Sequence, residues 1–304
     1  MMEGMNFAAI DIGTNAARLL IKNIDNNPLG ETKFRKVLFI RYPLRLGMDV
    51  YSIGKVGQER ATMMMRMIKG FKQMMNMYDV VDYRACATSA MRDAKNGEAI
   101  IRKIKKKTGV RIEIIDGKEE AGILYENHVA KLPDKEGTFI YVDVGGGSTE
   151  VTLIHQGQLV GSMSYNIGTL RLLNRAVKEG IVDGLKSDME GMFANYGPVN
   201  IIGSGGNINK LFRLAEGADR KSLKMPVESL RKLHAELQPL SIVERMDRFG
   251  LKPDRADVIV PAAEVFLIIA DCIHADYVYV PTIGLADGII GELYDKARQA
   301  TSVT

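Results

Sequence analysis

The sequence predicts an α/β protein that is built from two similar halves. Strand and helix patterns alternate along the 304 residues, and such alternation produces layers in which helices cover both faces of each sheet. Two stretches, residues 7–15 and 139–150, read almost as copies of each other, because each is an apolar strand that ends in one Asp and then turns through glycine. We interpret this repeat as the duplication of a whole domain.

The chain exceeds the usual length of one domain, so two domains are expected. Residues 132–137 interrupt both periodicities with proline, glycine and charge, which makes them the linker candidate. We therefore predict an N-terminal lobe at residues 1–131 and a second lobe at residues 132–284. The final helix, within residues 285–304, is a candidate to complete the first lobe.

In the first half, apolar residues alternate in the strands and recur at helical spacing between them. The predicted strands are residues 7–12, 17–24, 36–46, 80–87 and 110–115, and the predicted helices are residues 54–77, 96–108 and 117–129.

The second half restarts with a strand, a glycine loop and a return strand after residue 137. The pattern then predicts a helix over residues 169–179, a strand over 199–202, helices within 227–275, a short strand over 277–280 and a last helix over 285–297.

Composition narrows the classes of function. The net charge of +4 is mild and spread along the chain, so we expect no dedicated nucleic-acid surface but a good match to a small polyanion. Both cysteines lie in apolar segments and are expected to be reduced thiols of a cytoplasmic protein. We expect no signal peptide and no membrane span, and we leave a homodimer open.

The two glycine loops predict two phosphate clamps. Glycine lets consecutive backbone N–H groups converge on an anion, and an Asp at the strand end can hold a hydrated divalent cation beside it. Neither loop is the dinucleotide fingerprint or the Walker loop. The candidate phosphate-binding residues are Gly13, Thr14, Asn15, Gly145, Gly146, Gly147 and Ser148, and the candidate metal ligands are Asp11, Asp143 and Glu150. Mg²⁺ is the predicted ion, with Mn²⁺ as the alternative.

A third glycine loop, residues 203–207, follows a strand and precedes a helix. A glycine turn at that position also occurs for structural reasons alone. Because it is the third such loop in the chain, we include Gly205 among the candidate phosphate-binding residues.

Taken together, these motifs resemble the exopolyphosphatase and guanosine pentaphosphate phosphohydrolase family, in its short form without the C-terminal HD-like region. The resemblance covers residues 7 to about 295. It rests on residues 11–15 with Arg18, residues 44–47, 87–92, 117–121, 143–150 and 166–172, and residues 255–257.

The family resemblance implies the fold, the substrates and further site residues. It implies duplicated actin/Hsp70/sugar-kinase-like domains, which are ribonuclease H-like, with an interdomain cleft. The implied substrate is inorganic polyphosphate or guanosine pentaphosphate, from which the terminal phosphate is released. Glu120 matches the position of the catalytic base, and Arg18, Arg45 and Arg92 are the implied phosphate-binding arginines.

Two positions depart from the family pattern. Ala16 stands where a serine is usual, and Ala286 stands where an arginine is usual. Two alternatives therefore stay open beside the hydrolase. One is a weakly catalytic sensor that binds polyphosphate or an alarmone, and the other is an ATP-dependent kinase of the same superfamily, which the loop at residues 203–207 would suit.

Overall fold

The computed structural model describes residues 4–26, 32–129, 134, 136–281 and 283–302. The chain divides into two compact units. Unit 1 comprises Met1–Asn127 and Leu285–Thr304, and unit 2 comprises His128–Gly284. No helix in the described part of the chain is both long and apolar enough to cross a membrane.

Unit 1 contains a five-stranded mixed sheet in the order β3-β2-β1-β4-β5. Strands β1, β2 and β3 are antiparallel neighbours, whereas β4 runs parallel to β1 and β5 runs parallel to β4. The strands are β1 (Met5–Ile12), β2 (Ala17–Asn26), β3 (Thr32–Tyr42), β4 (Val80–Ala87) and β5 (Glu113–Ile114). The helices are α1 (Leu46–Ile53), α2 (Gln58–Met77), α3 (Ser89–Asp93), α4 (Gly97–Thr108), α5 (Gly117–Val129) and α13 (Leu285–Ser302).

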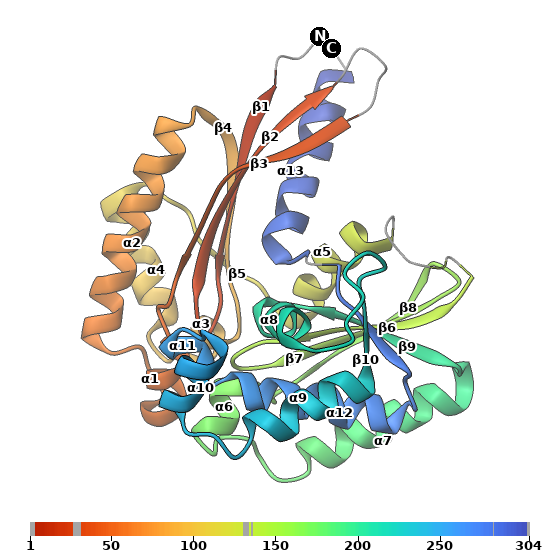
Figure 1. Cartoon of the computed structure of the whole chain (residues 1–304). Coiled ribbons are helices and arrows are strands. Elements are labelled where there is room, and N and C mark those ends of the chain that lie inside the picture. The colour runs from red at the N-terminus through yellow and green to blue at the C-terminus, as the bar shows by residue number, and fades with distance from the viewer. Residues whose placement is uncertain (1–3, 27–31, 130–133, 135, 282, 303–304) are drawn as a thin grey trace. The chain divides into compact units, whose positions relative to one another are not determined.

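Helices cover both faces of this sheet, as the two-residue alternation of the strands requires. Ile10 and Ile12 of β1 point to one face and join a core with Met64 and Phe71 of α2 and Ile104 of α4. Helix α13 packs against β1, β2 and β4 on the opposite face (Figure 1). The C-terminal helix thus belongs to the first sheet although 155 residues, 130–284, lie between the end of α5 and its own start.

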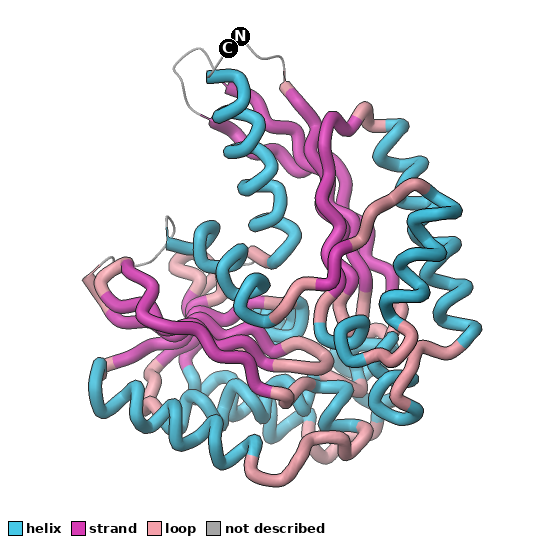
Figure 2. Tube along the Cα trace, turned by 180° about the vertical axis from the view of Figure 1, so that it is seen from behind, coloured by secondary structure: helices cyan, strands magenta, loops and turns pink. Residues whose placement is uncertain are grey.

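Unit 2 contains a six-stranded mixed sheet in the order β10-β11-β9-β6-β7-β8. The strands are β6 (Thr138–Val144), β7 (Thr149–His155), β8 (Gln158–Tyr165), β9 (Val199–Ser204), β10 (Lys224–Pro226) and β11 (Tyr277–Tyr279). Strands β6, β7 and β8 are antiparallel neighbours, and β9 and β11 continue the sheet in parallel. Figure 2 shows the strands in magenta and the helices in cyan.

The helices of unit 2 share one large apolar core around α12, which is buried along most of its length. Helix α12 contacts α6, α7, α8, α9 and β6. The helices are α6 (Thr169–Leu173), α7 (Ile181–Tyr196), α8 (Gly206–Leu214), α9 (Val227–Leu237), α10 (Ile242–Phe249), α11 (Pro253–Ala256) and α12 (Ile259–Cys272).

The expected α/β class and the duplication are confirmed by the topology. Three antiparallel strands followed by two parallel ones give the order β3-β2-β1-β4-β5 in unit 1, and unit 2 repeats that order as β8-β7-β6-β9-β11 with β10 added at the edge. Each glycine loop therefore joins the first two strands of its own unit.

Several predicted boundaries are wrong for local reasons. The strand expected over residues 36–46 ends at Tyr42, because Arg45 adopts a left-handed conformation, with φ 53°, and α1 begins directly after it. The helix expected over residues 54–77 begins at Gln58, since Gly54 (φ 72°) ends α1. The strand expected over residues 110–115 pairs only at Glu113 and Ile114.

In unit 2, the helix expected over residues 169–179 ends at Leu173, and α7 starts only after Gly180, which has φ 79°. The region 227–275 contains α9, α10, α11 and α12 with breaks between them. The expected linker at residues 132–137 lies largely outside the described residues.

Candidate functional site

The two glycine loops fold into the same tight turn. The N–H of Gly13 donates to the carbonyl oxygen of Ala16 at 3.1 Å, and the N–H of Gly145 donates to that of Ser148 at 2.9 Å. Ala16 in the first loop is therefore the counterpart of Ser148 in the second. The duplication extends to the conformation of the loops, but at this position only the second loop has a hydroxyl.

The first loop is held by two other segments of unit 1. Thr14 is buried, and its hydroxyl lies 2.8 Å from the hydroxyl of Ser89 and accepts the N–H of Ala90. The carbonyl oxygens of Thr14 and Asn15 accept the N–H groups of Gly47 and Arg45. The left-handed backbone of Arg45 thus lies directly against this loop, and the structure brings together the predicted residues 13–15 and Arg45.

Asp11 and Arg18 form an ion pair. They lie opposite each other in the antiparallel register of β1 and β2, and Arg18 Nη1 donates to Asp11 Oδ2 at 2.5 Å. The predicted metal ligand of the first loop is therefore engaged by a predicted phosphate-binding arginine. The role of Asp11 in metal binding stays a prediction.

The second loop has a different charge pattern at the matching positions. Asp143 lies opposite Glu150 in the register of β6 and β7, so a carboxylate stands where unit 1 has Arg18. Glu150 is buried, and its Oε1 accepts the hydroxyl of Ser164 at 3.1 Å. Opposed carboxylates in one register repel each other unless a cation lies between them.

The carbonyl groups of the three glycines in the second loop accept hydrogen bonds from helix α6. Gly145 accepts the N–H of Thr169, Gly146 accepts those of Leu170 and Arg171, and Gly147 accepts Arg171 Nε at 2.7 Å. Within the described residues, the N–H groups of Gly146, Gly147 and Ser148 make no backbone hydrogen bond. Consecutive N–H groups of this kind can receive an anion.

Two glycines are required by close approach at this loop. A Cβ on Gly168 would lie 2.5 Å from the nitrogen of Gly147, and a Cβ on Gly205 would lie 2.7 Å from Asp143 Oδ1. Gly205 also has φ 95°. The third loop therefore lies beside the carboxylate of Asp143, and the structure brings Gly205 together with the second loop.

Glu120 lies in the first turn of α5 and is only 9% exposed. Its N–H donates to the carbonyl oxygen of Asp116, and the Asp116 side chain accepts the N–H of Glu119. Arg92 Nη1 donates to the carbonyl oxygen of Ile115 at 2.8 Å. Arg92 therefore lies at the start of the segment that positions Glu120.

The sequence did not predict a role for Arg84, which lies at the centre of a network of ion pairs in unit 1. Its guanidinium group binds the carboxylates of Glu113 (3.0 Å), Glu292 (2.8 Å) and Glu119. These contacts join β4, β5, the first turn of α5 and α13. An isolated arginine in a strand pattern gives no signal of such a network, because its partners are distant in sequence.

Thr169 and Arg255 were also not predicted as site residues. The hydroxyl of Thr169 is fully buried and has no hydrogen-bond partner within the described residues. Arg255 Nη1 donates to Asn207 Oδ1 at the start of α8, next to Gly206. Both lie in stretches on which the family resemblance rests, and this was the feature of the sequence that could have identified them as site residues.

Comparison with known proteins decides the family. The model of the Ppx/GppA phosphatase family matches residues 28–297. The chain belongs to this family. A crystal structure of the Aquifex aeolicus family member shares the fold, with a TM-score of 0.75, 25% identity and coverage of 97% of this chain and 99% of that one. The actin-like, two-part architecture implied by the resemblance is thereby confirmed.

Two curated relatives show the range within the family. The chain is 24% identical to a guanosine-5'-triphosphate,3'-diphosphate pyrophosphatase of Vibrio parahaemolyticus, with 96% of this chain and 60% of that protein covered. It is 23% identical to exopolyphosphatase 1 of Mycobacterium bovis, with 98% and 91% covered. The chain spans about half the length of the first relatives that match.

Proposed function

We propose that this protein is a Mg²⁺-dependent phosphoanhydride hydrolase that releases the terminal phosphate from inorganic polyphosphate or guanosine pentaphosphate. One observation carries the proposal. The N–H groups of Gly146, Gly147 and Ser148 have no backbone acceptor in the described structure, and they lie in the loop between Asp143 and Glu150, which oppose each other in the register of β6 and β7. Anion-binding amides beside two carboxylates suit a phosphate chain with its cation.

Asp143 and Glu150 would hold the metal. Mg²⁺ prefers oxygen ligands, usually takes one or two carboxylates from the protein, and keeps several waters or substrate oxygens. No cluster of three or more potential ligands from His, Cys, Asp and Glu occurs in the described part of the chain, so a two-carboxylate site fits this ion better than Zn²⁺. When bound, the ion would neutralise charge on the phosphate chain.

Glu120 would act as the general base. Hydrolysis of a phosphoanhydride needs a group that orients and deprotonates water in line with the phosphoryl group. Glu120 is buried on a helix whose first turn is fixed by Asp116 and, through Glu119, by Arg84.

The test measures phosphate release from polyphosphate, guanosine pentaphosphate and ATP, each with and without Mg²⁺. We expect Mg²⁺-dependent release from at least one of the first two. Glu120→Gln should lower turnover by about 10² to 10⁴ while substrate binding persists, because the amide keeps the shape without the basicity.

Glu98→Gln is the control, because this carboxylate of α4 is 70% exposed and lies 3.8 Å from Arg102, so the variant should retain most turnover. Release at the wild-type rate by Glu120→Gln would remove Glu120 from the mechanism. Binding of polyphosphate without any release by the wild-type protein would favour the sensor alternative, which Ala16 in place of a hydroxyl residue supports.

A further inference from the structure

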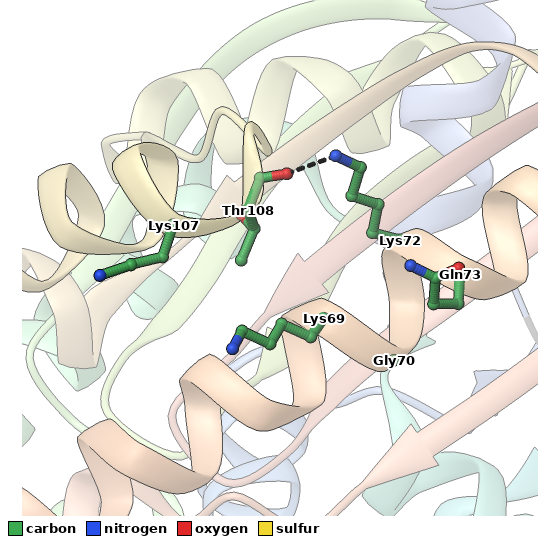
Figure 3. Close-up of a pocket in the computed structure, with 6 residues that line it drawn as sticks. All are labelled: Lys69, Gly70, Lys72, Gln73, Lys107 and Thr108. Atoms are coloured by element: carbon green, nitrogen blue, oxygen red, sulfur yellow. Dashed lines mark hydrogen bonds between the residues drawn. The ribbon is translucent and has the colours of Figure 1, made fainter.

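A hollow of about 390 Å³ lies between two helices of unit 1, away from the glycine loop. Lys69, Gly70, Lys72 and Gln73 of α2 and Lys107 and Thr108 of α4 line it (Figure 3). In Figure 3 the side chains of Lys69 and Lys107 extend to the same side of the two helices. The lining contains three ammonium groups and no carboxylate.

The three lysines differ in how the fold uses them. Lys72 Nζ donates to the carbonyl oxygen of Thr108 at 2.6 Å, and this contact satisfies the C-terminal end of α4. Lys69 and Lys107 are exposed and take part in no hydrogen bond or ion pair within the described residues. Two cations at the rim of the hollow are therefore available to a ligand.

Several partly buried cations of unit 1 pair with acids instead, namely Arg18, Lys22, Arg60 and Arg84. Cations that converge on a concave surface without acids focus a positive potential there. Such a surface attracts an anion with several charges more strongly than one with a single charge.

Gly70 of α2 is a second feature of this hollow. It lies in the interior of α2, where glycine destabilises a helix relative to alanine, yet a Cβ at this position would meet nothing within 4 Å. No packing contact therefore requires the glycine. Its absent side chain keeps the floor of the hollow open between Lys69 and Lys107.

We propose that this hollow docks the distal part of a polyphosphate chain whose terminal phosphate is held at the glycine loop of unit 1. The inference rests on the proposed hydrolysis of polyphosphate. Helix α4 has 12 residues and thus spans about 18 Å; its first residue follows α3, whose Ser89 contacts Thr14. The hollow is therefore about one helix length from the first loop, so only a long chain can occupy both.

The ligand chemistry favours polyphosphate over nucleic acid. The lining has no aromatic side chain on which bases could stack. Lysine ammonium groups act as point charges toward phosphate oxygens. A linear chain of phosphates matches the row of cations without any base-specific contact.

The test compares two double variants of the full chain with equal loss of charge. The variant Lys69→Gln with Lys107→Gln removes the rim cations. The control, Lys105→Gln with Lys106→Gln, removes two exposed cations of α4 that do not line the hollow. Binding of labelled long-chain polyphosphate and of tripolyphosphate is measured by titration at several salt concentrations, with thermal unfolding as the check on folding.

We expect the rim variant to weaken binding of long-chain polyphosphate by about tenfold, with a shallower salt dependence, and the control to change it by less than about twofold. Tripolyphosphate binding should be unchanged in both. Equal weakening in both variants, no weakening in the rim variant, or equally strong competition by a single-stranded oligonucleotide would overturn the docking site.

The outcome separates this inference from the proposed hydrolysis. If the wild-type protein releases phosphate but the rim variant binds long chains normally, the docking site is wrong and the hydrolase stands. If the rim variant loses binding and no phosphate is ever released, the hydrolase is wrong and the docking site stands.

Discussion

At the scale of single residues, the two loops differ in what faces each strand-end Asp. Arg18 faces Asp11 in unit 1, whereas Glu150 faces Asp143 in unit 2. A guanidinium group pairs with the first carboxylate, whereas two carboxylates that oppose each other favour the binding of a cation. This difference concentrates the predicted metal site on unit 2 and leaves the first loop to bind phosphate.

Thr169 allows a test of the second loop at one atom. Its buried hydroxyl has no partner in the described structure, and its N–H donates to Gly145. If the hydroxyl donates to a bound phosphate, Thr169→Val should lower kcat/KM by about 10- to 100-fold, the value of one hydrogen bond to a charged group. Stability should not fall, because valine removes an unsatisfied polar group.

Thr152→Val is the matched control for Thr169→Val. Thr152 is equally buried in β7, but its hydroxyl lies 2.9 Å from that of Ser162. This variant should lose stability by about 1 kcal/mol and keep its activity. Unchanged kcat/KM in Thr169→Val would show that its hydroxyl does not contact the substrate.

At the scale of elements, Arg84 ties the C-terminal helix to the sheet of unit 1. Its side chain is 16% exposed and binds Glu292 of α13 as well as Glu113 and Glu119. Arg84→Met would leave three carboxylates without their common cation, and we expect a loss of about 1 to 3 kcal/mol in the free energy of unfolding. Urea unfolding measures this value.

The exposed pair Arg102 and Glu98 provides the control for Arg84. Its atoms are 3.8 Å apart and both side chains are about 70% exposed, so Arg102→Met should change stability by less than about 0.5 kcal/mol. Equal losses in the free energy of unfolding for the two substitutions would show that the ion pairs of Arg84 stabilise the protein no more than an exposed surface pair does.

The elements also show what the sequence could predict. Long strands such as β1 and β4 lie close to where the apolar pattern placed them, because the sheet to which they belong is covered by helices on both faces. Short elements were misjudged at Arg45 and Gly180, where single left-handed residues end one element and begin the next. Such breaks depend on backbone conformations that periodicity does not report.

From the residue pattern alone, the candidate site was predictable where it lies in loops that carry glycine and Asp, whereas Glu120 and the arginines Arg18, Arg45 and Arg92 came from the family resemblance. Residues 11–15 and 143–150 were found from that pattern, whereas Arg84 and Ser89 were not. Arg84 gains its partners from β5, α5 and α13, and Ser89 meets Thr14 across 75 residues of sequence. Contacts of this range come from sheet order, which the sequence alone did not define.

At the scale of the whole molecule, the two sheets have the same topology, but the glycine loops that they position carry different side chains. The same strand order and the same glycine turn occur in both units. One loop retains a hydroxyl and two opposed carboxylates, and the other has Ala16 and an ion pair. The interdomain cleft implied by the family resemblance stays a prediction, as does the division of labour between the units.

Whether Asp143 holds Mg²⁺ is tested most directly by measuring phosphate release from polyphosphate as a function of Mg²⁺ concentration. The measurement compares the wild-type protein, Asp143→Asn and the control Asp183→Asn, whose side chain is exposed. We expect Asp143→Asn to raise the half-saturating Mg²⁺ concentration by at least about tenfold, or to abolish turnover, without a loss of stability. Asp183→Asn should behave as the wild type. A full rate at an unchanged Mg²⁺ requirement in Asp143→Asn would contradict the metal site and, with it, the proposed mechanism.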